Sequence, residues 1–291
     1  GEFLSDEKAS YHLIETKAKN VITVGLQHGY NPENKLFLNL HKSDFNKKNY
    51  LKDNINYSPK PNYFLSQGEQ YNSTVKNALP KQNSKIIGSL KYDHFDKLRK
   101  NKVALRKKYS KILNLSNKKI LLILTSISDY TFIIDFFTEW EKFSNWKILL
   151  CPHPATDLIE IKDYISKKHP KLEIKFIKNI SSYNLIPISN LVVTGYSVTA
   201  IEALYFNVQS IRLYDIGTFP IFDNEKLIPV FYRNSDFIKW INNYDSSYNK
   251  DLRIEQLNLV KKYFYLLDGR AKDRLWNNIQ SLDKNISGLA N

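Results

Sequence analysis

A turn over residues 194–202 combines the residue types of an anion-binding site. Gly195 permits a tight turn, and Ser197 and Thr199 supply hydroxyls where a predicted strand gives way to a predicted helix. Unpaired backbone N–H groups and the helix dipole favour a phosphate at such a helix N-terminus. Glu202, one turn into the helix, would reach a sugar hydroxyl. The alternative is that Ser197 only caps the helix and Glu202 only stabilises its first turn.

Two further loops follow neighbouring predicted strands and would border the same site. His153 lies between Pro152 and Pro154, which stiffen the chain, and its imidazole would donate to a phosphate oxygen. Thr125 and Ser126 follow the preceding strand and would touch a phosphate or the transferred group. The alternatives are a loop histidine bonded to backbone and an ordinary polar loop.

The first half of the chain offers two candidate general bases. His28 follows a predicted strand between Gly25 and Gly29, which would let backbone approach a ligand. It would accept a proton from an acceptor hydroxyl or donate to a phosphate. Glu69, after the next predicted strand, is the other candidate. For His28, a purely structural turn histidine is an equal alternative.

These segments must be positioned by parallel strands. Short β-branched runs that end in glycine or polar turns alternate with amphipathic stretches, which is typical of βαβ units and a doubly wound parallel sheet. Ligands bind at the carboxyl ends of the strands in such sheets. The predicted strands are 21–24, 63–66, 85–87, 120–124, 147–151, 172–177, 191–194 and 210–213. The predicted helices are 130–143, 158–168, 182–188, 197–206, 254–267 and 270–282.

The chain of 291 residues is long enough for two domains. The change to a Lys-rich helical pattern after residue 91 places the domain link there. We therefore predict an N-terminal domain over 1–100 and a C-terminal domain over 101–291. The first has few strands and no clear helices, so we expect it to be the latter part of a larger domain. The absence of methionine also suggests a piece of a longer protein.

Composition excludes several classes of protein. The chain is 42% hydrophobic and 25% charged, which argues against disorder, and its single cysteine excludes a disulfide framework. The net charge of +14 predicts attraction to anionic surfaces. The aromatic residues fall at core-like periods, so we do not expect a nucleic-acid partner. P-loop, nucleophile-elbow, dinucleotide-fingerprint and zinc-protease motifs are all absent from the sequence.

The order of these segments resembles the GT-B glycosyltransferases of bacterial surface polysaccharides. The nearest kin are the capsule and lipopolysaccharide enzymes that use CMP-activated Kdo or sialic-type sugars, and the CDP-glycerol polymerases of teichoic acid. The segments behind the resemblance are Gln27-His28-Gly29, Gly68-Glu69, Ile87-Gly88-Ser89 with Asp93, His153-Pro154, residues 189–203, and Asp268-Gly269-Arg270-Ala271 with Arg274.

The resemblance implies an α/β fold of two Rossmann-like domains with parallel sheets, and tail helices that cross back to the first domain. It implies an enzyme that moves a CMP-activated sugar to a bacterial glycan or lipid-linked acceptor without a metal or other cofactor. His153, Ser197 and Thr199 would hold the donor phosphate, and Glu202 a ribose hydroxyl. The acidic base motif of bacterial sialyltransferases is not found, so His28 or Glu69 would take that role.

Three alternatives stay open. One is a CDP-glycerol or ribitol phosphotransferase, the second a sugar-nucleotide 2-epimerase, and the third a non-catalytic nucleotide- or glycan-binding module. The expected location is the cytoplasm, at the inner face of the cytoplasmic membrane.

Overall fold

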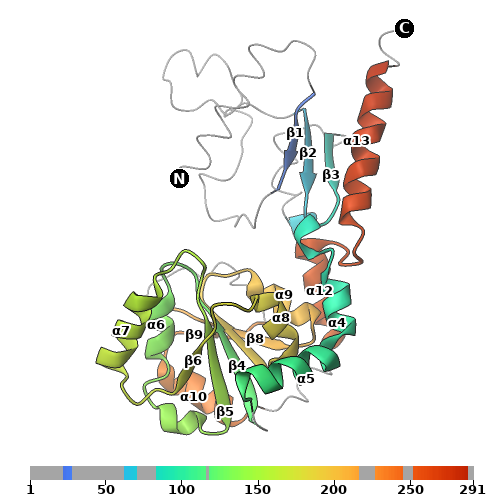
Figure 1. Cartoon of the computed structure of the whole chain (residues 1–291). Coiled ribbons are helices and arrows are strands. Elements are labelled where there is room, and N and C mark those ends of the chain that lie inside the picture. Colours follow the sequence, from blue (N-terminus) through green and yellow to red (C-terminus); the bar gives the residue numbers. More distant parts are fainter. Residues whose placement is uncertain are drawn as a thin grey trace, which may run out of the picture. The chain divides into compact units, whose positions relative to one another are not determined.

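The computed structural model describes residues 22–27, 62–70, 83–115, 118–215, 227–244 and 252–287. They belong to two compact units (Figure 1). Unit 1 comprises Gly1–Asp93 and Lys261–Asn291, and unit 2 comprises His94–Val260. The division therefore falls after Asp93, whereas the sequence placed it after residue 100, and the last part of the tail belongs to unit 1.

Unit 1 contains a small parallel sheet in the order β1-β2-β3. Its strands are β1 (Val24–Leu26), β2 (Tyr63–Ser66) and β3 (Ser84–Ile86). The first begins at Val24, where the sequence predicted the end of a strand. Side-chain amides close the carboxyl end of the β1–β2 pair, because Gln67 donates its backbone N–H to Oε1 of Gln27 at 2.6 Å and its Nε2 to the Gln27 carbonyl at 3.1 Å.

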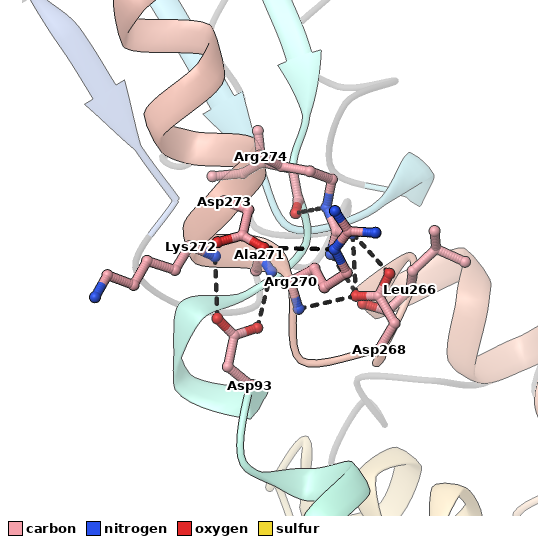
Figure 2. A network of polar contacts seen from close by, with 9 residues as sticks. Asp93, Leu266, Asp268, Arg270, Ala271, Lys272, Asp273 and Arg274 are labelled. Atoms are coloured by element: carbon pink, nitrogen blue, oxygen red, sulfur yellow. Dashed lines mark hydrogen bonds and ion pairs between the residues drawn. The ribbon is translucent and has the colours of Figure 1, made fainter.

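The tail of the chain contributes helix α13 (Ala271–Ser287) to unit 1, after α12 (Arg253–Phe264), inside which the unit boundary falls. Both carboxylate oxygens of Asp93 accept backbone N–H groups at the start of α13, from Ala271 at 2.9 Å and from Lys272 at 3.0 Å (Figure 2). These bonds satisfy donors that a helix leaves unpaired at its N-terminus.

Arg274, on the first turn of α13, fixes the helix to the strand and turn beside it. Its Nε donates to the Ile87 carbonyl at 2.7 Å, and its Nη1 donates to both carboxylate oxygens of Asp268 at 2.9–3.0 Å (Figure 2). Gly88 and Gly269 have φ of +82° and +76°, which favour glycine. The two motifs behind the family resemblance, at 87–93 and 268–274, therefore form one structural clamp.

Unit 2 is a six-stranded parallel sheet in the order β6-β5-β4-β7-β8-β9. The chain proceeds outward from β4 on one side and then returns to start again beside it with β7, which is the doubly wound topology. The strands are β4 (Lys119–Leu124), β5 (Trp146–Cys151), β6 (Ile174–Phe176), β7 (Leu191–Thr194), β8 (Gln209–Leu213) and β9 (Val230–Phe231). The sequence predicted all of these except β9, which has only two residues.

Helices cover both faces of this sheet (Figure 1). One face is covered by α6 (Tyr130–Asp135), α7 (Leu158–Lys168) and α10 (Asn234–Asn242), and the other by α5 (Lys102–Leu113), α8 (Ser182–Leu185) and α9 (Thr199–Tyr205). Short α4 (Phe95–Lys100) precedes α5. On the first face the rings of Phe137, Phe143 and Phe237 pack with centroids 5.0–5.7 Å apart.

One sequence prediction about helices needs correction. The predicted helix over 130–143 ends at Asp135 and is followed by turns and a 3-10 helix at Trp140–Phe143. The Lys-rich stretch in which the sequence places the domain link is helical, as predicted, and forms α4 and α5 of unit 2, which bury Phe95, Tyr109 and Leu113. The apolar residues at helical spacing thus pack these helices onto unit 2, while most of the lysines remain at the surface. No helix in the described ranges is long and apolar enough to cross a bilayer.

Candidate functional site

Three loops leave the carboxyl edge of the unit 2 sheet at the same level. Leu124, the last residue of β4, is in register with Cys151 on β5 and with Thr194 on β7. The loops that begin at Thr125, Pro152 and Gly195 therefore start side by side. The strand order reverses between β4 and β7, and in doubly wound sheets this position forms the ligand crevice.

Asp129 joins two of these loops, and the sequence analysis did not single it out. Its Oδ1 accepts the N–H of Ser126 at 2.6 Å, and its Oδ2 accepts the N–H of Tyr196 at 3.2 Å. The residue is 0% exposed. Burial raises the pKa of Asp129, and the hydrogen bonds from Ser126 and Tyr196 oppose that rise in part. The sequence pattern that could have indicated this role is an acidic residue directly before a helix and three positions after Ser126.

Gly195 is required by this carboxylate. A Cβ atom at residue 195 would lie 2.6 Å from Oδ2 of Asp129, closer than real Cβ atoms approach other heavy atoms. The sequence explained this glycine by a tight turn at a phosphate site. The structure gives it a different neighbour, because the space beside its Cα is filled by Asp129.

Ser197 and Thr199 lie together at the start of α9. The Ser197 Oγ accepts the N–H of Thr199 at 3.2 Å and is hydrogen-bonded to the Thr199 hydroxyl. Both side chains are partly exposed. Val198 is the N-cap of α9 and makes no side-chain cap bond, and Ser197 instead accepts the N–H of the first helical residue. The predicted phosphate contact of these hydroxyls stays a prediction.

Thr125 places a buried hydroxyl at the end of β4. Its Oγ1 has no hydrogen-bond partner among the described residues. The same holds for Oγ1 of Thr156, in the loop after β5. A buried hydroxyl without a partner costs about 1–3 kcal/mol. Two hydroxyls with unused hydrogen-bonding capacity thus lie in loops at the carboxyl edge, and a bound ligand would satisfy groups of this kind.

His153 is exposed in the loop after β5, next to Pro154. Its Nδ1 accepts the N–H of Ala155 at 3.2 Å, and its carbonyl accepts the N–H of Thr156 at 2.9 Å. Because Nδ1 is an acceptor, the neutral ring has its proton on Nε2. The loop therefore presents Nε2–H as a donor, the group that the predicted phosphate contact requires.

Cys151, the last residue of β5, precedes this loop. Burial raises the pKa of its thiol to about 11, so this cysteine is a poor nucleophile.

The remaining predicted residues are less directly placed. Glu202 is 0% exposed within α9, so its predicted contact with a ribose hydroxyl, which stays a prediction, needs a ligand that reaches beneath the surface. Glu69 is exposed after β2 in unit 1. His28 lies outside the described residues. Among the described residues, no three His, Cys, Asp or Glu side chains form a group suited to a metal. The expectation of metal-independent chemistry stays untested.

Comparisons with known proteins identify the fold. No protein-family model and no curated protein sequence matches the chain. Among solved structures, the wall teichoic acid polymerase TagF is similar with a TM-score of 0.58 and 16% identity, over 94% of this chain and 70% of that chain.

Two other structures show the same likeness. A putative UDP-N-acetylglucosamine 2-epimerase from Listeria monocytogenes has a TM-score of 0.53 and 13% identity, over 97% of this chain and 80% of that chain. A glycosyltransferase from Rickettsia africae has a TM-score of 0.53 and 15% identity, over 94% of this chain and 74% of that chain. Together with the two parallel sheets, these similarities show that the chain has a GT-B fold, as the sequence predicted.

Proposed function

We propose that this chain is a GT-B transferase that moves a sugar or a related group from a nucleotide-activated donor to a glycan acceptor. The observation that supports this most is the carboxyl edge of the unit 2 sheet, where the loops after β4 and β7 are joined through Asp129 at the point of strand-order reversal. A nucleotide phosphate bound there would be met by the Nε2–H of His153 and by hydroxyls. The glycosyltransferase and teichoic acid polymerase among the similar structures agree with this reaction class.

In the proposed complex, His153 donates Nε2–H to a phosphate oxygen of the donor. The partly exposed hydroxyls of Ser197 and Thr199 contact the same phosphate. The buried hydroxyl of Thr125 and the hydroxyl of Ser126 line the edge beside it. Such contacts stabilise the negative charge that grows on the leaving nucleotide. The acceptor hydroxyl loses its proton to Glu69 or His28.

We propose two donor classes. The first is a CMP-activated Kdo or sialic-type acid, which the sequence resemblance favours. The second is a CDP-linked glycerol or ribitol, because TagF structures, including one of a histidine variant soaked with CDPG, are among the similar structures. Product mass separates the two, since only the second reaction adds a phosphodiester.

The test is a calorimetric titration of CMP, CDP, UDP and GDP against the protein. We expect a cytidine nucleotide to bind, and His153→Ala and Ser197→Ala each to weaken its binding about 10–150-fold, the effect of losing one hydrogen bond to a charged group. His169→Ala, in the other His-Pro pair, and Ser166→Ala, at an exposed position of α7, are the matched controls. If no nucleotide binds, or if control and site variants weaken binding equally, the proposal is wrong.

The proposed location is the inner face of an anionic membrane, motivated by the net charge of +14 and a lipid-linked acceptor. Co-sedimentation with phosphatidylglycerol vesicles that weakens as salt rises would support it. Absence of binding, or binding insensitive to salt, would contradict it.

A further inference from the structure

Two cavities with basic linings lie at the amino edge of the unit 2 sheet, opposite the edge discussed above. The first, of about 500 Å³, is lined by Lys102, Val103, Arg106, Lys107, Ser110, Ile188, Ser189 and Asn190. The second, of about 710 Å³, is lined by Lys118, Lys119, Lys142, Asn145, Trp146, Ile241, Asn242 and Tyr244. Six cationic side chains and no carboxylate are among these lining residues, and one of the six, Lys142, is ion-paired with Glu139 outside the lining.

A hydrogen bond at Asn190 links the linings of the two cavities. The Asn190 carbonyl accepts the hydroxyl of Tyr244 at 3.0 Å, which joins a residue of the first cavity to a residue of the second. The Oδ1 of Asn190 accepts the N–H of Ile120 at 2.8 Å, directly after Lys119. The two linings therefore flank the same part of the amino edge, and an extended ligand that crosses this edge would contact both.

Two of the cations are held in place by the protein, and Arg106 and Lys102 in the first cavity repel each other. Nη1 of Arg106 donates to the Ile188 carbonyl, and the Lys119 ammonium lies over the rings of Trp146 and Tyr244, 5.6 Å and 5.9 Å from their centroids. Burial lowers the pKa of Lys102, and the charges of Arg106 and Arg253 lower it further. An anion bound between these side chains would relieve that repulsion.

We propose that this basic amino edge binds an anionic, polyhydroxylated chain: an acidic glycan or a polyol-phosphate polymer. Phosphate or carboxylate groups of the chain contact the six cations. Its hydroxyls bond to the serine hydroxyl and asparagine amides between them, which are Ser110, Asn190, Asn145 and Asn242. The assignment of the chain as a growing glycan rests on the proposed function. The basic edge itself does not.

The geometry favours such a chain over two other anionic partners. A lipid bilayer presents a broad surface, whereas these cations line concave spaces that a single chain can enter. Single-stranded nucleic acid needs exposed ring faces on which bases stack. Trp146 and Tyr244 are each only 8% exposed, and Lys119 lies over them.

The test measures binding of fluorescent poly(glycerol phosphate) and of polysialic acid to the full chain by anisotropy. The double variant Lys107→Gln, Lys118→Gln removes one exposed cation from each cavity. We expect its Kd for at least one of the polymers to rise about fivefold, as for two exposed ion pairs. Lys162→Gln, Lys239→Gln, on α7 and α10, has the same change of charge outside both cavities and should stay within about twofold.

Competitor ligands decide between partners. Neutral dextran, phosphatidylglycerol vesicles and a single-stranded oligonucleotide are compared on the wild type and on both double variants. The proposal is overturned if neither polymer binds, if both double variants lose equal affinity, or if the amino-edge substitutions weaken only the vesicles or only the oligonucleotide. Cytidine nucleotide titration of the same variants should be unchanged. If the wild type binds no cytidine nucleotide, the proposed function is wrong. The polymer measurements still decide whether the basic amino edge binds an anionic chain.

Discussion

In each compact unit one carboxylate accepts two backbone N–H groups, but the surroundings of the two carboxylates are opposite. Asp93 in unit 1 caps α13 beside a turn that Arg270 and Arg274 fill with further ion pairs and hydrogen bonds (Figure 2). Asp129 in unit 2 is fully buried, and its hydrogen-bond partners are N–H groups of two loops. Near it, the Thr125 hydroxyl has no hydrogen-bond partner among the described residues.

The difference separates a structural clamp from a candidate binding site. In the unit 1 clamp the Asp93 and Asp268 carboxylates and the Arg274 guanidinium are used in hydrogen bonds within the protein. At the carboxyl edge of unit 2, a donor on His153 and the Thr125 hydroxyl remain available. Buried polar groups are normally paired in a stable fold, so unused capacity at a strand-order reversal indicates a ligand.

The largest expected effect comes from Gly195→Ala. The new Cβ would displace the Asp129 carboxylate, so we expect the free energy of unfolding to fall by about 2–4 kcal/mol. Urea denaturation measures this. Because the clash is with Asp129, the double variant Gly195→Ala, Asp129→Ala should lose less than the sum of the two single losses. Strict additivity would contradict the contact. The control replaces Asp129→Ala by Asp135→Ala, which removes a half-exposed carboxylate that Gly195 does not contact. The losses from Gly195→Ala and Asp135→Ala should add.

Asp93→Ala should cost about 1–2 kcal/mol of stability, because it leaves the N-terminal donors of α13 without their cap. Arg274→Lys should also destabilise, since one ammonium cannot replace the bonds to Ile87 and Asp268. Neither substitution should change nucleotide binding by unit 2, measured by calorimetry. A large change in nucleotide affinity would show that the clamp takes part in the site.

Thr125→Val tests the opposite expectation at the carboxyl edge of unit 2, namely that a substitution lowers nucleotide affinity and does not lower stability. Removal of a buried hydroxyl without a partner should leave stability unchanged or raise it by up to about 1 kcal/mol. If the hydroxyl contacts the donor, nucleotide affinity should fall about 5–10-fold, the effect of losing one neutral hydrogen bond. Parallel thermal unfolding and nucleotide titration separate the two effects. A loss of stability with unchanged affinity would assign Thr125 to the fold alone.

The smallest effects concern pH, and here the two units should respond with opposite sign. The pKa of Asp129 is raised in the folded protein by burial, so its contribution to stability is present below 3.8, the ordinary value, and is lost as the pH rises through the folded pKa. Burial also opposes ionisation of Asp268, but hydrogen bonds from Arg274 and Arg270 hold its pKa below 3.8. Its contribution is therefore present above 3.8 and lost as the pH falls through the folded value.

Urea denaturation of Asp129→Asn, Asp268→Asn and the wild type from pH 3 to pH 7 checks this. The loss caused by Asp268→Asn should be largest at neutral pH and should vanish in acid. The loss caused by Asp129→Asn should shrink as the pH rises. If the losses caused by the two substitutions change with pH in the same direction, the contrast between the units is wrong.

The sequence by itself determined the elements of unit 2. The apolar runs of β4, β5 and β7 and the turns after them are local patterns, so the strands and the loops at their carboxyl ends could be predicted from composition and period. Short β9 and the early end of α6 could not, because two residues give no period, and the end of α6 depends on packing against the sheet.

Only the tertiary structure decided which polar residues meet. Asp129 and Tyr196 are 67 positions apart, and Asp93 and Lys272 are 179 apart, yet each pair shares a hydrogen bond. The segments at 87–93 and 268–274 belong to the family resemblance and form a clamp, whereas Asp129, which is part of no predicted motif, joins the loops of the candidate site. Such partnerships are set by the order of strands in the sheet and by chain closure over long distances, which no local pattern encodes.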